Sequence, residues 1–159
     1  MKSAISAAIL GAALAAAGSA TAAGNAALEA PIHQFIEAFN KGDIKTAAAT
    51  HLSTGVSIVD EVRPHIWQGP GAFMAWAGAL TADDKADGVT NESVTLGAVT
   101  REVVEADTAY VIIGATYSFK QKGKAMHEPA QMTYAMKKTA QGWKIAGWTW
   151  TGPNPTPVK

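Results

Sequence analysis

The segment Ser57–Val62, with the sequence SIVDEV, contains two carboxylates in a stretch that otherwise favours a β-strand. Val and Ile are common in strands, whereas Asp is depleted there. Because side chains alternate between the two faces of a strand, Asp60 should share the face of Val56 and Ile58 and point toward a core. A carboxylate in an apolar interior is costly unless it is paired, hydrogen-bonded or protonated. Asp60 is therefore a candidate catalytic acid or base, and a hydrogen-bonded structural carboxylate is the alternative.

Histidine is the other side chain that could move a proton near neutral pH. The histidines are His33, His51, His65 and His127, and no two of them have a metal-binding spacing such as H-x-H or H-E-x-x-H. We therefore expect no metal site. His65 and His127 lie on or beside expected strands, so each is a candidate catalytic partner for Asp60. His51 ends an expected helix, where a partly charged imidazole would suit the helix dipole.

The elements that must position these residues follow from the pattern of apolar side chains. Between residues 26 and 49 apolar residues recur at the three-and-four spacing of an amphipathic helix, and the turn NKGD at residues 40–43 divides this stretch into two helices. Residues 56–69 predict two short strands, or one strand bent at Pro64. A third helix is expected with Pro70 at its first position, and the polar segment 81–92 is expected to be a loop.

Segments rich in Val, Ile, Thr, Tyr and Trp make up most of the remaining sequence. They span residues 93–104, 109–121, 125–138 and 143–151. The turns between them are short and join antiparallel neighbours, so these segments predict a four-stranded meander. Helices followed by a curled antiparallel sheet are typical of the α+β class. The Pro-rich residues 153–159 are expected to form a loose, flexible tail.

The first residues have the pattern of a secretory signal peptide. Lys2 is followed by an Ala-rich apolar stretch from Ala4 to Ala17, and Ala20-Thr21-Ala22 fits the small-residue rule for cleavage. We expect residues 1–22 to be removed. The remaining domain, residues 23–152, would then be secreted or periplasmic in a bacterium, without membrane attachment.

Charge and composition exclude several classes of function. Thirteen basic and 13 acidic residues give a net charge of zero, so the sequence has no basic footprint for nucleic acid or a membrane surface. The chain has no cysteine, which excludes disulfides and thiol chemistry. No cofactor is expected.

The order of these elements resembles the NTF2-like superfamily and, within it, the SnoaL-like, ketosteroid-isomerase-like group. The resemblance covers nearly the whole chain after residue 22. It is most specific in the NKGD turn, in the strand that leads to Asp60, and in the closing hairpin YAMKKTAQGWKIAGWTW. It implies a cone-shaped α+β fold in which helices pack into a strongly curved antiparallel sheet around a deep pocket. It also implies a homodimer formed through the sheet. The segment 110–113 favours the same conclusion independently, because it has apolar residues on both faces of the strand and both faces should therefore be covered.

In the ketosteroid isomerases of this superfamily, an aspartate on the strand after the helical hairpin is the general base. Asp60 falls on that position within a one-residue insertion. The two oxyanion donors of those enzymes fall on Phe35 and on Met132, or on Gln131 if the register slips. Neither Phe35 nor Met132 can donate a useful hydrogen bond, and Gln131 would donate only weakly, so we do not expect steroid isomerisation.

The pocket that the resemblance implies would be lined by aromatic and apolar side chains. The expected lining residues are Phe35, Phe39, Trp67, Tyr117, Met132, Tyr134, Trp148 and Trp150, and Trp76 belongs to the same set of tryptophans. Such walls suit a small apolar or aromatic metabolite. The sequence leaves three functions open: a lyase or isomerase that uses Asp60 as acid or base, a pocket that binds without turnover, and a dimeric association module.

Overall fold

The computed structural model of this chain describes residues 25–159. The predicted signal peptide, residues 1–22, lies outside the described residues. Within them, no helix combines the length and apolar character needed to cross a membrane.

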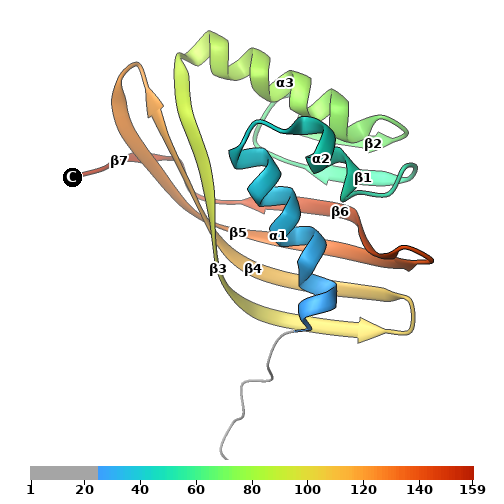
Figure 1. The fold of residues 1–159 in the computed structure, drawn as a ribbon. Coiled ribbons are helices and arrows are strands. Elements are labelled where there is room, and N and C mark those ends of the chain that lie inside the picture. The colour runs from blue at the N-terminus through green and yellow to red at the C-terminus, as the bar shows by residue number, and fades with distance from the viewer. Residues whose placement is uncertain (1–24) are drawn as a thin grey trace, which may run out of the picture.

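The described residues form three helices and seven strands in the α+β arrangement predicted from the sequence. The elements are α1 (Ala26–Asn40), α2 (Ile44–Ala49), β1 (Val56–Val59), β2 (Ile66–Gly69), α3 (Ala72–Asp87), β3 (Val89–Glu105), β4 (Thr108–Gln121), β5 (Lys124–Thr139), β6 (Gly142–Thr151) and β7 (Thr156–Pro157). The strands build one sheet in the order β2-β1-β6-β5-β4-β3, with β7 paired to β5. This sheet is strongly curved but not closed, and the helices pack on its concave side (Figure 1). The predicted meander is confirmed, because β3 to β6 are antiparallel neighbours.

The NKGD turn ends α1, begins α2 and ties the helices to the sheet. Asp43 Oδ1 accepts a hydrogen bond from Thr46 N at 3.0 Å and caps α2. Gly42 has a φ of +68°, which glycine adopts without strain. Asn40 bonds both main-chain groups of Val94 in β3: Nδ2 donates to the carbonyl oxygen at 2.8 Å, and Oδ1 accepts from the amide at 2.7 Å.

Replacing Asn40 with alanine is expected to lower the free energy of unfolding by about 2 kcal/mol, since the N–H and C=O of Val94 both lose a partner in a partly buried place. Urea unfolding of the two proteins measures the loss. Asn154→Ala, in the exposed tail, is the matched control and should leave the stability unchanged. Equal stability of Asn40→Ala and wild type would show that water replaces both bonds.

Helix α3 differs from the prediction at both ends. It begins two residues after Pro70, because Gly69 and Gly71, with φ values of +83° and +77°, turn the chain sharply on both sides of the proline. It continues to Asp87, so most of the polar segment predicted to be a loop is helical. Polar residues are as typical of a solvent-facing helix as of a loop, and only Gly88 separates α3 from β3.

The sheet is mixed rather than purely antiparallel as predicted. Strand β1 pairs with β6 in parallel, with Ser57 opposite Gly147. A Cβ atom at position 147 would lie 2.5 Å from the Ser57 carbonyl oxygen, so glycine permits this close approach. The pairing joins segments that are far apart in the sequence, and turn lengths cannot predict it.

The C-terminal segment is docked on the sheet, where the sequence predicted a loose tail over residues 153–159. Strand β7 pairs with β5, with Pro157 opposite Met126 and Thr156 opposite His127. Val158 N adds a hydrogen bond to the carbonyl oxygen of Ala125 at 3.0 Å.

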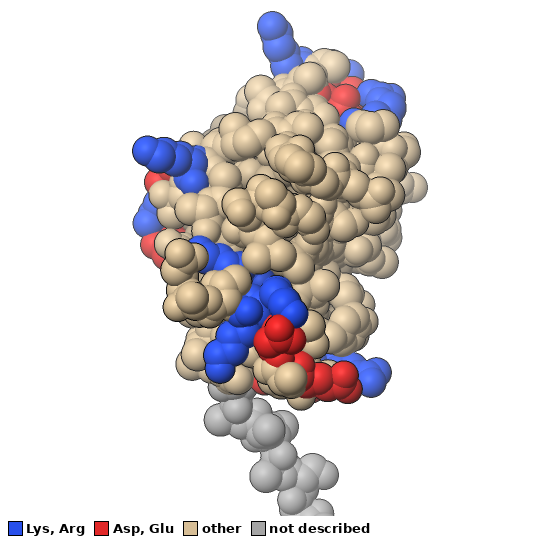
Figure 2. Space-filling view, turned by 90° about the vertical axis from the view of Figure 1, so that its right-hand side faces the viewer, with Lys and Arg blue, Asp and Glu red and all other residues tan. Residues whose placement is uncertain are grey.

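The outer face of the sheet is the surface on which a dimer is predicted. In β4, Val111 and Ile113 are buried in the core, whereas Tyr110 is 41% exposed on the opposite face. The homodimer stays a prediction. Figure 2 shows a different side of the molecule, the one on the right in Figure 1, where Lys and Arg lie close to Asp and Glu and uncharged side chains fill a large central area. This face therefore has no large patch of a single charge.

Candidate functional site

Asp60 lies in the tight turn between β1 and β2. Val56 and Ile58 are buried, as the alternation predicted, and β1 ends one residue before Asp60. The carboxylate Oδ1 of Asp60 accepts a hydrogen bond from Val62 N at 2.9 Å, and the Asp60 amide donates to the His65 carbonyl oxygen at 3.1 Å. A carboxylate that bonds the backbone two residues on stabilises such a turn. One oxygen is thereby fixed by the backbone, and the Trp76 indole and the Glu61 amide also act on the carboxylate.

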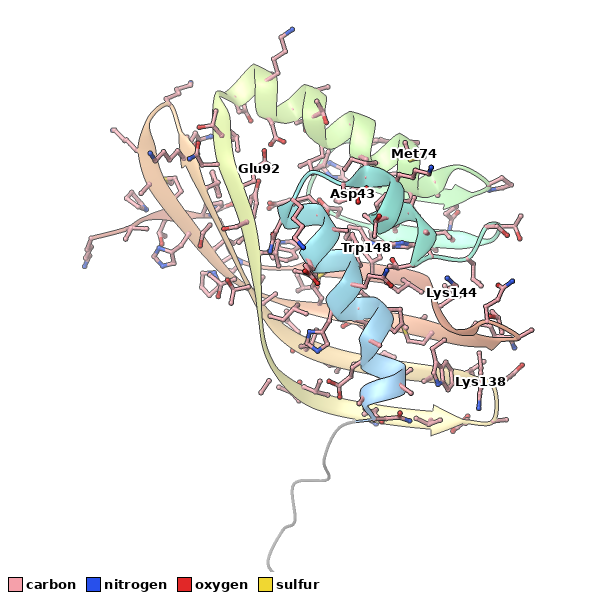
Figure 3. All side chains as sticks on the ribbon, in the orientation of Figure 1. Asp43, Met74, Glu92, Lys138, Lys144 and Trp148 are labelled. Carbon is pink, nitrogen blue, oxygen red and sulfur yellow. The ribbon has the colours of Figure 1, made fainter. Side chains whose placement is uncertain are left out.

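Asp60 forms part of the lining of a mostly apolar pocket between the helices and the concave side of the sheet. The cavity has a volume of about 60 Å³ and opens to solvent. The lining contains eight residues predicted from the sequence, namely Phe35, Phe39, Asp60, Trp76, Tyr117, Met132, Trp148 and Trp150. It also contains Ile36, Glu61, Val62, Leu80 and Val94. Trp148 lies where α1 crosses the sheet (Figure 3), with its ring centroid 5.8 Å from that of Phe35.

Burial raises the pKa of the Asp60 carboxyl, which is the direction predicted from the sequence. The Val62 amide, the Trp76 indole and the Glu61 amide partly oppose this shift, because each favours the ionised carboxylate. The carboxyl is thus desolvated enough to bind a proton more readily than a surface aspartate, which is the property that a general base requires.

Two hydrogen-bond donors in the same pocket are not satisfied. Trp76 Nε1 and the Tyr117 hydroxyl are buried and form no close hydrogen bond with the described residues; the Trp76 N–H points toward the Asp60 carboxylate and the Tyr117 hydroxyl toward Glu92. The Trp76 N–H faces Asp60 closely enough to lower its pKa. Burial, followed by the charge of Glu92, raises the pKa of Tyr117, so its hydroxyl keeps its proton. Buried donors are rarely left unpaired in folded proteins, and both can serve a bound oxygen atom.

A second carboxyl pair lies at the edge of the pocket. Glu61 follows Asp60 in the turn and lines the pocket while part of its side chain stays exposed to solvent, whereas Glu128 of β5 is 0% exposed. Trp150 Nε1 donates to Glu128 Oε1 at 2.8 Å, and Glu128 Oε2 is buried without a donor. The Glu61 carboxyl faces Glu128, and burial, the charges of Glu128 and Asp60, and a hydrogen bond with Glu128 raise the pKa of Glu61 to about 7.

Two of the predicted lining residues belong to the core and do not line the pocket. Trp67 of β2 is 8% exposed and pairs with Ile58 across the β1–β2 ladder. Tyr134 of β5 is completely buried, and its hydroxyl donates to the sulfur of Met132 at 3.0 Å. Both are buried as part of the core and not at the pocket wall.

Neither histidine predicted to assist Asp60 lines the pocket. His65 is exposed in the same turn and meets Asp60 through its main-chain carbonyl group. His127 sits opposite Ser118 and Thr156 in β5, one residue from the inward-facing Glu128, so its side chain points to the other face of the sheet. The described residues show no hydrogen bond between the Asp60 carboxylate and a histidine ring, and His65 acts on it only through its charge, which is the last of the effects that lower the Asp60 pKa. Within residues 25–159 no cluster of three or more His, Cys, Asp and Glu side chains could hold a metal ion.

His51 is a buried structural residue and not the partly charged helix cap predicted from the sequence. Its Nδ1 lies 3.0 Å from the Ala47 carbonyl oxygen, and its Nε2 accepts a hydrogen bond from Trp148 Nε1 at 3.1 Å. This assigns the proton to Nδ1 and leaves the ring neutral. Burial, opposed by the Ala47 bond and reinforced by the charge of Lys144, lowers the pKa of His51 to about 4.

The stability of the fold should therefore contain an acid-sensitive contribution from His51. The unfolded chain binds a proton at this imidazole below about pH 6.5 and the folded chain only near pH 4, so this contribution is lost as the pH falls between these values. We expect the stability difference between wild type and His51→Gln to shrink by about 3 kcal/mol over that range. Urea unfolding at several pH values measures it. A charged His51 ring in the folded protein at pH 6, seen by NMR, would contradict the assignment.

An open, curved sheet that wraps around helices, with an apolar pocket between them, defines an α+β class of fold. A family model of the SnoaL-like domain matches residues 28–149. The chain belongs to this family, and its resemblance to the SnoaL-like group is confirmed. A comparison with curated protein sequences gives no significant match.

Solved structures of the NTF2-like superfamily share the fold. A ketosteroid isomerase-like protein from Erwinia carotovora atroseptica is 22% identical, with a TM-score of 0.63 over 82% of this chain and 96% of that one. A type 2 hexachlorocyclohexane dehydrochlorinase is 14% identical, with a TM-score of 0.71 over 84% and 88%. An NTF2-like superfamily protein from Salmonella enterica serovar Typhimurium is 15% identical, with a TM-score of 0.64 over 81% and 90%. At these identities the likeness establishes the fold.

Proposed function

We propose that this protein binds a small apolar or aromatic molecule that carries a carbonyl group and acts on it as an isomerase or lyase, with Asp60 as the base that removes a proton from carbon. The observation that carries the proposal is the partly buried Asp60 carboxylate in an apolar pocket beside two unpaired donors. The names of structures with the same fold include an isomerase-like protein and a dehydrochlorinase, which agrees with this class of reaction.

The donors differ from those of the ketosteroid isomerases. Phe35 and Met132 line the pocket and cannot donate a useful hydrogen bond. Trp76 Nε1 and the Tyr117 hydroxyl can, and they come from α3 and β4. A carbonyl oxygen bound by these two groups would place its neighbouring C–H bond toward Asp60. Aromatic side chains of α1 and β6 would bind the flat body of the substrate.

The direct test is proton exchange at carbon. Residues 23–159 are incubated in D₂O with small cyclic ketones such as cyclohexanone and 1-indanone, and proton NMR measures the loss of the signals next to the carbonyl group. We expect exchange above the buffer rate for ketones that fit the pocket. If the protein binds these ketones, as seen by tryptophan fluorescence, without accelerating exchange, the binding function replaces the catalytic one.

Binding without turnover is the second candidate function, and the narrow interior of about 60 Å³ favours it, because only a small group can enter without side-chain movement. In either case we propose that the protein acts after export and as a homodimer. N-terminal sequencing of protein from an exporting host should begin at Ala23 or Gly24. Light scattering of this mature form should give twice the monomer mass, and a monomer at micromolar concentration would remove the dimer.

A further inference from the structure

Glu128 is the most deeply buried carboxylate of the described residues, and its environment indicates a role. It is 0% exposed on β5, and Tyr117 is its partner on β4. Trp150 Nε1 satisfies Oε1, but Oε2 has no donor among residues 25–159. The chain also leaves space for it, because a Cβ atom at Gly152 would lie 2.9 Å from the Glu128 Cδ carbon and closer still to Oε1.

The titratable group in contact with the Glu128 carboxyl is the Glu61 carboxyl, and the two share a hydrogen bond. Two carboxylates in contact cannot both be ionised without strong repulsion, whereas one proton between them makes a hydrogen bond. The other titratable groups near Glu61 are Asp60 in the same turn and Tyr117 on β4, and neither supplies positive charge. No Lys or Arg lines the pocket. The pair therefore holds one proton near neutral pH, in agreement with the pKa of about 7 for Glu61.

We propose that Glu61 is the proton donor that complements Asp60, and that Glu128 is the positioning residue that keeps Glu61 protonated and turned toward the pocket. This inference rests on the proposed function. Glu61 lines the pocket and can reach a bound oxygen atom, whereas Glu128 lies behind it and does not line the pocket. The substrate class is therefore a small ketone whose carbonyl oxygen lies between Glu61 and the unpaired donors.

The step balances without a further reactant. Asp60 takes a proton from the carbon next to the carbonyl group, and the electron pair of that C–H bond forms a C=C bond. The π electrons of the carbonyl group move to oxygen, which takes the proton of Glu61. The products are the neutral enol, a protonated Asp60 and an ionised Glu61, and the reverse transfers return both groups to their starting states. Return of the proton to a different carbon would give the isomerised ketone.

The protonation state can be measured without a substrate. In protein with ¹³C-labelled glutamate carboxyl groups, NMR should show one carboxyl that titrates with a midpoint near 7. Glu61→Gln should remove this signal. Glu128→Gln should move it toward the ordinary glutamate range, because it removes the negative partner, and Glu105→Gln, on the exposed end of β3, should leave it unchanged. A Glu61 carboxyl that is fully ionised at pH 6 in the wild type would overturn the proposal.

The ketone exchange assay then tests the chemical role. We expect the exchange rate of the wild type to fall above pH 7, as Glu61 ionises, and we call this decrease the alkaline limb of the pH profile. In Glu61→Gln the exchange rate should be about a hundredfold lower, and the alkaline limb should be absent. Glu128→Gln should keep the limb but move it to lower pH, which a merely structural residue would not do. Full exchange by Glu61→Gln with an unchanged alkaline limb would overturn the donor role and leave the proposed function standing. A wild type that exchanges no ketone would contradict both, even if the titration shows a shared proton.

Discussion

Replacing Asp60 with asparagine is expected to lower the rate of carbon–deuterium exchange by about a hundred- to ten-thousandfold, which is the usual contribution of a general base. The asparagine has the same shape, and its Oδ1 atom can still accept the hydrogen bond from Val62 N that fixes the turn. The loss should therefore appear in the rate and not in the binding of the ketone. Asp107→Asn, in the exposed turn between β3 and β4, is the matched control and should exchange like the wild type.

The same variant should be at least as stable as the wild type near neutral pH. Folding raises the pKa of Asp60, so the folded protein binds this proton more tightly than the unfolded chain and is disfavoured when the carboxyl ionises. This cost is present above the folded pKa and disappears as the pH falls below the unfolded value. Thermal melts should show a Tm of Asp60→Asn that equals or exceeds that of wild type at pH 7.5, with the advantage smaller at pH 5. A lower Tm at pH 7.5 would make Asp60 a structural carboxylate.

Replacing Gly147 with alanine is expected to destabilise the protein by about 3 kcal/mol or more, because the new methyl group would meet a main-chain oxygen that cannot rotate away. The contact of 2.5 Å with the Ser57 carbonyl oxygen can be relieved only by moving β1 from β6. We expect the Tm to fall by roughly 10 °C. Ketone binding should weaken as well, since Asp60 follows directly on β1.

Gly78→Ala is the control for this substitution. Gly78 lies in α3 with no atom within 4 Å of an added Cβ, so alanine should stabilise the helix by about 0.5–1 kcal/mol. If Gly147→Ala melts at the wild-type temperature, the β1–β6 pairing is looser than the structure shows.

Local patterns predicted the elements and the direction of Asp60 but not the position of the pocket along the strands. Tyr134 and Met132 have the same alternation and are both buried, yet Met132 lines the pocket and Tyr134 does not. The difference depends on where the helices leave the sheet uncovered, which is a long-range property. The parallel pairing of β1 with β6 was missed for the same reason.

Glu128 could have been found from the sequence. It has the same parity as Met132, Tyr134 and Met136, which are all buried, so alternation alone places it on the inner face of β5. The neighbouring His127 is a more familiar proton carrier, but it has the opposite parity. Alternation therefore excludes His127 and selects Glu128. The contact with Glu61 needed the structure, because the two residues come from segments without a local link.

The end of β1 at Val59 has a consequence for how this scaffold could be altered by evolution or by design. Within a regular strand, neighbours such as Asp60 and Glu61 would face opposite sides, but in the turn both reach one pocket. The base and the proposed acid thus depend on a few residues outside the ladder, whereas the buried glutamate is held by the strands around it. A change in the length of this turn could exchange or remove the chemistry while the sheet, and with it the fold, is inherited intact.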